Sequence, residues 1–420
     1  MDCKNQSVFI FIILSMVTLG FSQDKVIEQV TPEAINSRID KIRKGKIEVQ
    51  TKPGTEVSVK QLQHEFKFGA AVANQVVKGT QDAMSKKDRE KYLEILSENF
   101  NYAVHENALK WYDCEKKQDA VDYHTADQIW DLCEERDISM RGHCIFWAKD
   151  EFNLEWLKKL DNDQLRKEVK ERALDVTRHF KGRISEFDLN NEMIHGNFFT
   201  RKLGYGVINE MAYMAKAGNP DITLYLNDYG ILAGGGYNKS RYIQQIEQLL
   251  ANGVPIDGIG CQAHFITSDE NDSYGRAAAS SRELQETLNE LSELGLPIKI
   301  TECLFTADTK ALMGEELRRV FPIFFAHPNV EAIVMWGFWA GAHWVPRTAM
   351  WNKDWSPTPQ VKAYQELVFN KWWTDTSGPA DSDGIYSTDA FYGDYIITSN
   401  GQEKKVTLSK EDKVIRIDFE

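Results

Sequence analysis

Short apolar runs alternate along the chain with longer segments of helical periodicity. The runs are rich in β-branched and aromatic residues and predict strands at 66–73, 102–106, 139–147, 184–190, 222–228, 258–264, 298–302 and 332–337. Between them, apolar residues three and four apart predict amphipathic helices that include 86–98, 120–135, 163–179, 237–251, 281–294 and 315–325. A strand followed by a helix, about eight times over roughly 300 residues, is typical of a (β/α)₈ barrel, an α/β fold. A doubly wound open sheet is disfavoured because no GxGxxG turn follows any of the runs.

Two shorter segments flank the predicted barrel. Residues 46–63 alternate β-type residues around Pro53-Gly54 and predict a short N-terminal β-hairpin. Residues 374–383 are rich in Ser, Asp, Gly and Pro, which favours a linker, and the segments after it alternate like strands at 391–398, 404–408 and 414–419. This C-terminal β extension is too small to be stable alone, so it is expected to pack on the barrel or on the hairpin. A structural or adhesive role for it stays open.

The first residues resemble a secretory signal peptide. Lys4 supplies a weak positive charge, residues 8–19 are almost uniformly apolar, and Gly20 and Ser22 are small residues before a cut at Gln23. The apolar run is too short for a good membrane span, although an uncleaved anchor is the alternative. We therefore expect four regions, namely a signal peptide at 1–22, an N-terminal arm with the hairpin at 23–62, the barrel at 63–370 and a linker with a β module at 371–420. The mature protein is expected to be extracellular and monomeric.

Net charge and aromatic content limit the classes of molecule that the protein is expected to bind. The net charge of −13 disfavours nucleic acid and anionic membranes, whose binding needs clustered Lys and Arg, whereas a neutral polymer remains compatible. The chain has 11 Trp and 15 Tyr, which fill cores but also stack on the apolar faces of sugar rings.

The cysteines do not indicate a metal centre. Cys3 would leave with the signal peptide, and the remaining Cys114, Cys133, Cys144, Cys261 and Cys303 show neither CxxC nor zinc-type spacing. No metal or other cofactor is therefore expected. Cys144 and Cys261 lie in apolar runs, as buried thiols do, and any disulfide pairing is left open.

Polar residues end nearly every predicted strand, which is where barrels place catalytic groups. The ends are His105-Glu106-Asn107, His143 with Trp147, Asn190-Asn191-Glu192, Asn227-Asp228-Tyr229, Gln262-Ala263-His264, Thr301-Glu302 and Trp336-Gly337. One such residue is commonly a cap or a satisfied core group, but so many together are hard to explain by packing alone.

Glu192 and Glu302, about 110 positions apart, stand at the ends of two otherwise apolar strands. Either glutamate alone could equally be a buried carboxylate held by a salt bridge or hydrogen bonds. Together they match glycoside hydrolysis, which needs one protonated carboxyl and one carboxylate. Burial and the charge of Glu302 would raise the pKa of Glu192 so that it holds its proton. Asn191 is suited to bind a sugar 2-hydroxyl, and His264 and Tyr229 are suited to orient Glu302.

The same stretches resemble glycoside hydrolase family 10, the retaining (β/α)₈ xylanases, over about residues 64–367. They are, in order, HEFKFG (64–69), ENALKW (106–111), RGHCIFW (141–147), DLNNE (188–192), LNDY (226–229), GIGCQAH (258–264), ITE (300–302) and Trp336-Gly337 with Trp344. Each is weak alone, but their order and positions at strand ends are specific. The third and fourth are most similar to the plant- and animal-type branch.

The resemblance implies an endo-β-1,4-xylanase acting on xylan or a related β-1,4-glycan. It implies Glu192 as acid/base and Glu302 as nucleophile. The residues implied to hold the sugar two units toward the non-reducing end are Glu106, Asn107 and Lys110. Those implied around the cleaved sugar are His143, Trp147, Asn191 and Gln262. His264 is implied to bond to the nucleophile, and Trp336 and Trp344 are implied to form aromatic walls of the cleft.

The chain departs from the family pattern near the third and eighth strands. Ala148 and Asp150 stand where His and Gln are usual, Cys303 replaces a common Leu, and Ala342-His343 precede the last cleft Trp. These changes touch neither carboxylate and bear on subsites only. Two alternatives remain open, namely the same chemistry on cellulose or mixed-linkage glucan, and a non-catalytic carbohydrate-binding barrel.

Overall fold

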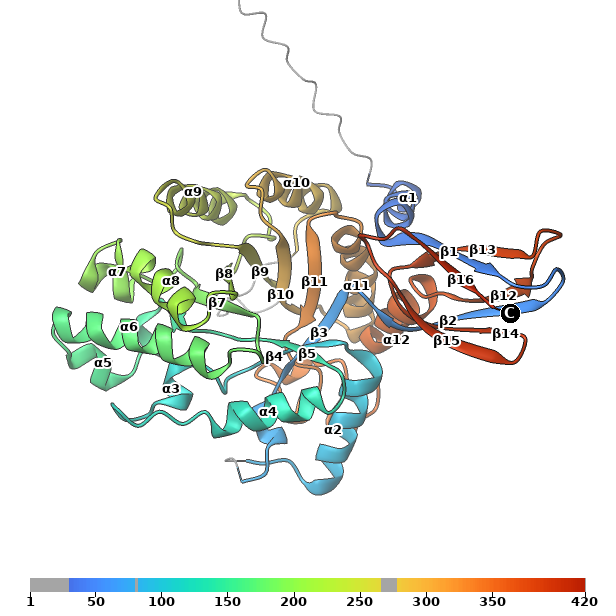
Figure 1. The fold of residues 1–420 in the computed structure, drawn as a ribbon. Helices are drawn as coiled ribbons and strands as arrows, with labels where there is room; N and C mark the ends of the chain where they lie inside the picture. Colours follow the sequence, from blue (N-terminus) through green and yellow to red (C-terminus); the bar gives the residue numbers. More distant parts are fainter. Residues whose placement is uncertain (1–29, 80–81, 266–277, 420) are drawn as a thin grey trace, which may run out of the picture.

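A barrel forms the centre of the computed structural model, which describes residues 30–79, 82–265 and 278–419. Its strands are β3 (Lys67–Val72), β4 (Tyr102–His105), β5 (Ser139–Arg141), β6 (Phe146–Trp147), β7 (Glu186–Asn191), β8 (Thr223–Asp228), β9 (Gly258–Phe265), β10 (Ile298–Phe305) and β11 (Val330–Met335). They hydrogen-bond in the order β5-β4-β3-β11-β10-β9-β8-β7-β6, and the neighbours are parallel (Figure 1). β5 and β6 are the two parts of one interrupted strand, which the sequence predicts as a single run at 139–147. Between them Gly142 bridges to Phe187, so eight strand positions close into the predicted (β/α)₈ barrel.

Helices surround the barrel and bury one face each. They are α2 (Lys86–Asn99), α3 (Trp111–Cys114), α4 (His124–Glu134), α5 (Glu155–Lys159), α6 (Asn162–His179), α7 (Phe198–Leu203), α8 (Val207–Gly218), α9 (Tyr237–Ala251), α10 (Ser281–Ser292), α11 (Lys310–Phe325) and α12 (Pro359–Glu366). In α6, the apolar residues Leu165, Val169, Ala173 and Val176 recur at helical spacing and are buried, and Asp161 caps the first turn. Strands β9 and β10, enclosed on both faces, are buried along their whole length.

The two ends of the chain build a β domain beside the barrel (Figure 1). After α1 (Pro32–Arg43), its strands are β1 (Lys44–Gln50), β2 (Glu56–His64), β12 (Asp375–Pro379), β13 (Ile385–Phe391), β14 (Gly393–Ser399), β15 (Gln402–Leu408) and β16 (Val414–Asp418). They form two sheets, ordered β13-β1-β16 and β12-β2-β14-β15. Residues from both sheets, among them Val49, Val59, Tyr395 and Ile397, share one buried apolar cluster.

The N-terminal strands therefore do not form the predicted hairpin with each other. β1 pairs with β13 and β16, whereas β2 pairs with β12 and β14. The chain around Pro53 and Gly54 crosses between the sheets, and Gly54 N donates to the carbonyl of Ala380 at 2.9 Å. Local alternation predicts a strand but not its pairing partner. Here both N-terminal strands pair with strands from the C-terminal part of the chain. For the same reason, β12 lies inside the stretch 374–383 that the sequence favours as a linker.

All five cysteines that follow the predicted signal peptide are buried free thiols. This resolves the pairing that the sequence leaves open. The predicted signal peptide itself, residues 1–22, lies outside the described residues. In the part of the chain that the structure describes, no helix combines the length and apolarity that crossing a membrane requires.

Candidate active site

The two predicted carboxylates stand at the same end of the barrel. Glu192 directly follows β7, and Glu302 lies in the carboxyl-terminal part of β10. Because the strands are parallel, both positions belong to the mouth where barrels carry their active sites. The register of β10 against β9 shifts between Ile300 and Glu302, so that Glu302 pairs with Gln262. Such an irregularity re-aims a side chain, here beside the side chains that end β8 and β9.

Glu302 is held by donors on both carboxylate oxygens. Asn227 Nδ2 donates to Oε1 at 2.7 Å, and His264 Nε2 lies 3.0 Å from Oε2. His143 Nε2 lies 3.9 Å from Oε1. Burial by itself would raise the pKa of Glu302, but the His264 hydrogen bond and the nearby His143 and Lys110 outweigh it, so the pKa is lowered. Glu302 is therefore kept ionised, the state that a nucleophile needs.

Glu192 has the opposite electrostatic setting. Trp147 Nε1 donates to its Oε2 at 2.9 Å and Gln262 Nε2 to its Oε1 at 3.2 Å. Burial raises the pKa of Glu192 to about 7, the negative charges of Asp228 and Glu302 add to the rise, and the two hydrogen bonds offset it only in part. Glu192 thus keeps its proton to near-neutral pH, as a general acid requires.

Amide side chains connect the two carboxyl groups. Asn191 Oδ1 accepts from Asn227 Nδ2 at 3.0 Å and from Gln262 Nε2 at 3.2 Å. Asn227 also contacts Glu302, and Gln262 also contacts Glu192. The network fixes Asn191 by its oxygen and leaves its Nδ2 group to donate to a ligand hydroxyl, such as a sugar 2-hydroxyl.

The residues after β4 form one side of the site. Lys110 Nζ donates to Asn107 Oδ1 at 3.0 Å and lies 4.6 Å from the ring centre of Trp147 and 5.8 Å from that of Trp336. Glu106 is buried, and burial raises its pKa to about 7 although Lys110 opposes the rise. The three residues that the resemblance assigns to a distant sugar are thus brought to the same mouth.

Two tryptophans border the nucleophile side. Trp336 packs edge-on against His143, with ring centres 5.0 Å apart, and Trp344 packs edge-on against His264 at 5.5 Å. Trp344 is 45% exposed. Aromatic rings beside buried carboxyls suit sugar rings, which stack their apolar faces on them.

Several residues that matter at the site were not singled out from sequence. Asp188 on β7 accepts from His143 Nδ1 at 2.8 Å and pairs with Arg141 at 2.5 Å, so it fixes the ring that faces Glu302. Asn227 supplies the donor to Glu302, whereas Tyr229, which the sequence suggests for that task, stacks on His195 with ring centres 3.6 Å apart. The sequence does show the polar pair Asn227-Asp228 at the end of a strand. It does not show which of the neighbouring side chains contacts Glu302.

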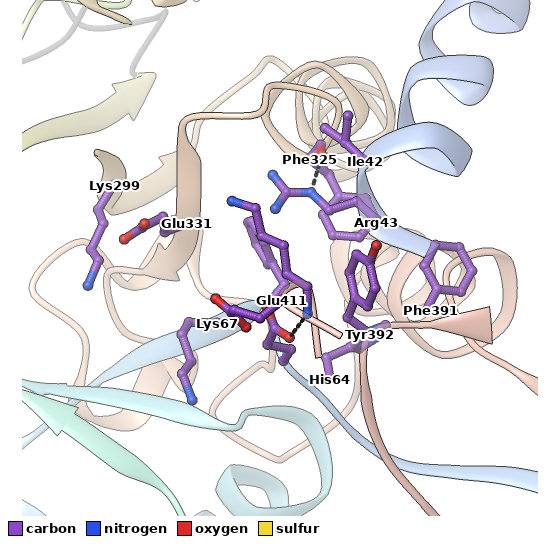
Figure 2. Close-up of a pocket in the computed structure, with 13 residues that line it drawn as sticks. Ile42, Arg43, His64, Lys67, Lys299, Phe325, Glu331, Phe391, Tyr392 and Glu411 are labelled. Carbon is purple, nitrogen blue, oxygen red and sulfur yellow. Dashed lines mark hydrogen bonds between the residues drawn. The ribbon is translucent and has the colours of Figure 1, made fainter. Parts of the chain in front are cut away.

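A separate cavity of about 270 Å³ lies away from this mouth (Figure 2). Lys67, Lys299 and Glu331, near the amino-terminal ends of their strands, line it on the barrel side, and Arg43 and Tyr392 line it on the side of the β domain. It therefore occupies the junction of the β domain and the barrel floor, and neither Glu192 nor Glu302 lines it.

Comparison with known families and proteins gives a consistent result. The model of the family described as Glycosyl hydrolase family 10 matches residues 58–368. Endo-1,4-beta-xylanase 1 of Arabidopsis thaliana is 30% identical over 376 residues, covering 87% of this chain and 38% of that protein. The anti-sigma-I factor RsgI6 of Acetivibrio thermocellus is 33% identical over 371 residues, covering 86% of this chain and 46% of that protein. The chain thus spans less than half the length of these curated relatives.

A solved structure of the same architecture is that of native xylanase 10B from Thermotoga maritima. It superposes with a TM-score of 0.63 and 25% identity, over 73% of this chain and 96% of the other. Xylanase 10B from Thermotoga petrophila, solved in complex with xylobiose, matches with the same TM-score and identity.

Proposed function

Because the chain belongs to glycosyl hydrolase family 10, we propose that it is an endo-β-1,4-xylanase that cleaves xylan with retention of configuration. The observation that carries the proposal is the pair of buried glutamates at the barrel mouth, whose pKa values are shifted in opposite directions. Opposed shifts assign one residue to donate a proton and the other to act as a base or nucleophile. The relatives named endo-1,4-beta-xylanase and the xylobiose complex of a structural neighbour support a β-1,4-xylan substrate.

In the proposed first step, ionised Glu302 attacks the anomeric carbon and forms a covalent glycosyl ester. Protonated Glu192 gives its proton to the glycosidic oxygen, so the leaving sugar departs as a neutral alcohol. In the second step, Glu192, now ionised, takes a proton from water, whose oxygen attacks the same carbon and releases Glu302. Two inversions restore the β configuration, and the proton on Glu192 is regained.

The surrounding residues lower the barrier by holding these groups. Asn227 and His264 keep Glu302 ionised, and Trp147 and Gln262 fix Glu192. Asn191, immobilised by its oxygen, is positioned to donate to the 2-hydroxyl of the reacting sugar, a contact that strengthens toward the oxocarbenium-like transition state.

Activity on defined polymers tests the proposal. The full chain should release reducing ends from xylan faster than from carboxymethyl cellulose or mixed-linkage glucan, with Glu302→Ala as the inactive control. Proton NMR of the first products should show the β anomer. Faster cleavage of glucan would show that xylan is not the preferred substrate. An α anomer as first product would show inversion rather than retention. Binding without hydrolysis would favour a carbohydrate-binding barrel.

We further propose that the enzyme is secreted as a monomer after cleavage before Gln23. The apolar run at 8–19 and the small residues Gly20 and Ser22 support this. Expression of the full chain in a eukaryotic secretory host, with N-terminal sequencing and size-exclusion chromatography of the medium, checks both parts. Retention in the membrane fraction would instead indicate an uncleaved anchor.

A further inference from the structure

The turn that carries Glu192 has an unfavourable backbone that its surroundings must hold. Glu192 has φ +61, a left-handed conformation that residues with a Cβ rarely adopt. Glu192 N donates to Asn227 O at 2.8 Å, and Gly196 N donates to Glu192 O at the same distance. Asp228, at the end of β8, adds a side-chain clamp, because Ile194 N donates to its Oδ2 at 2.8 Å. The position of Glu192 therefore depends on Asp228.

His195 joins this clamp to the next strand end. Its Nδ1 lies 2.6 Å from Asp228 Oδ1, which also accepts from Tyr229 N at 2.9 Å. The imidazole of His195 also stacks on the ring of Tyr229, with ring centres 3.6 Å apart and an interplanar angle of 10°. One imidazole thus contacts both the carboxylate that holds the Glu192 turn and the aromatic ring beside it.

The order of strands places Tyr229 across the cleft from Lys110. The barrel strands can be followed from β4 to β8 in two directions. One direction passes β7, which precedes Glu192, and the other passes β10, which bears Glu302. A glycan that runs between the two carboxyls from Lys110 and Asn107, after β4, leaves on the side of the barrel where β8 and β9 end. Tyr229, directly after β8, therefore lies on the side toward which the leaving group departs.

From this geometry we infer that His195 is a positioning residue for the leaving-group side of the reaction, one that holds the acid/base turn through Asp228 and the sugar platform through Tyr229. The inference rests on the proposed function, since it names the part of the site that recognises the departing glycan. On the other side of the site, Glu302 is held by different residues, Asn227 and His264.

Two substitutions separate the two contacts of His195. In His195→Asn, the amide keeps a donor near the place of Nδ1 but removes the stacking face. In His195→Phe, the ring keeps the face but removes the donor to Asp228. The two variants are each other's matched control, because each retains the contact that the other loses.

Two substrates report the two effects. Xylotetraose needs both the proton from Glu192 and a platform for its leaving sugars, whereas 2,4-dinitrophenyl β-xylobioside carries a leaving group that departs without a proton. We expect His195→Asn to raise KM for xylotetraose roughly 3- to 10-fold at nearly unchanged kcat, the range of one aromatic stacking contact. We expect His195→Phe to lower kcat for xylotetraose on the order of 10- to 100-fold, the usual cost of a misplaced catalytic group. Neither should change the rate of glycosyl-enzyme formation from the dinitrophenyl substrate, measured as the burst of dinitrophenolate, by more than about two-fold, because that step needs no proton from Glu192.

A third variant keeps the inference testable if either ring replacement folds poorly. Tyr229→Leu should raise KM for xylotetraose as His195→Asn does, and the two effects should be non-additive in the double variant because they remove one shared element. Three outcomes would each overturn the role of His195. The His195 variants could lose xylotetraose turnover and glycosyl-enzyme formation from the dinitrophenyl substrate equally, or lose neither. The effects of His195→Asn and Tyr229→Leu on KM could also be fully additive. If the wild-type chain hydrolyses neither substrate, the proposed function fails instead, and that result precedes any variant.

Discussion

Glu192 and Glu302 are equally buried, each 4% exposed, yet their pKa values move in opposite directions. Burial would raise both. Around Glu302, the hydrogen bond from His264 and the nearby His143 and Lys110 reverse that effect, whereas Glu192 lies near the negative charge of Asp228. The comparison shows that burial supplies the sensitivity of a carboxyl to its neighbours, and the sign of those neighbours decides the protonation state.

The backbone under the two residues differs as well. Glu302 belongs to β10, which is hydrogen-bonded on both sides by β9 and β11. Glu192 lies outside its strand in a turn with positive φ. Glu302, the proposed nucleophile, is thus positioned by the sheet itself, whereas Glu192, the proposed acid/base, also depends on side-chain contacts that one substitution can remove.

The largest expected effect comes from removing the nucleophile. Glu302→Ala should lower kcat on xylan by on the order of 10⁵-fold or more, as loss of a covalent nucleophile does in other hydrolases. Steady-state rates on xylan, with circular dichroism to confirm folding, provide the measurement. Substantial turnover by a folded Glu302→Ala variant would refute the assignment of the two roles.

Removal of the acid/base should cost less and should depend on the leaving group. Glu192→Ala should lose roughly 10²- to 10⁴-fold on xylan, the usual contribution of a positioned proton donor. Formation of the glycosyl-enzyme from 2,4-dinitrophenyl β-xylobioside should change little, because that leaving group needs no proton. Azide should then accelerate turnover and yield the β-glycosyl azide. If both substrates lose equally, Glu192 is not the proton donor.

The same two carboxyls should affect stability with opposite signs. Glu192 opposes folding once the pH exceeds its ordinary pKa of 4.5, and the cost is complete above its folded value of about 7. Glu192→Gln should therefore raise the free energy of unfolding by on the order of 2–3 kcal/mol at pH 8 and by little at pH 4. Glu302, whose folded pKa is lowered, contributes stability above its ordinary pKa that is lost as the pH falls through the folded value. Glu302→Gln should therefore lower the free energy of unfolding at pH 8.

Urea unfolding of both variants at pH 8 and pH 4 measures the difference. The two substitutions are matched, since each replaces a buried carboxyl by an amide of the same shape. A shift of the same sign at pH 8 in both variants would mean that loss of hydrogen bonds, rather than charge, dominates.

The smallest expected effects are shifts in the pH dependence of kcat/KM, whose limbs report groups of the free enzyme. Activity should fall above about pH 7 as Glu192 loses its proton, and at acid pH as Glu302 gains one. His264→Ala should move the acid limb upward, because it removes the donor that holds the pKa of Glu302 down. Asp228→Asn should move the alkaline limb downward, because it removes a charge that raises the pKa of Glu192. Each variant should leave the other limb in place, and a common shift of both limbs would argue against separate control.

Sequence predicted the barrel well because each of its elements has a local signal. Strands β9 and β10 are continuous apolar runs, and their polar residues Gln262, His264 and Glu302 stand at the carboxyl-terminal side where parallel strands converge. Helix α8 was not among the predicted segments, although Val207, Met211 and Ala215 form a buried stripe at helical spacing. Its small residues and the neighbouring glycines weaken the amphipathic contrast on which such predictions depend.

The β domain shows where local signals fail. The alternation in β1 and β2 correctly indicates strands, and a Pro-Gly turn between two strands favours a hairpin. Yet both strands pair with segments more than 300 residues later in the chain, such as Lys44 with Phe391 and Lys60 with Asp375. Pairing at that distance depends on where the barrel brings the two chain ends, which no local pattern contains.

By itself, the sequence determined the number and order of the barrel elements and that Glu192 and Glu302 stand at the ends of apolar strands, because hydrophobic periodicity and strand ends are local properties. The tertiary structure decided which acid is protonated, through Asp228 on one side and His264 on the other. It also decided that His195 stacks on Tyr229 and that the chain ends share two sheets. These depend on contacts between residues distant in the chain, whose distances and charges exist only once the barrel has closed.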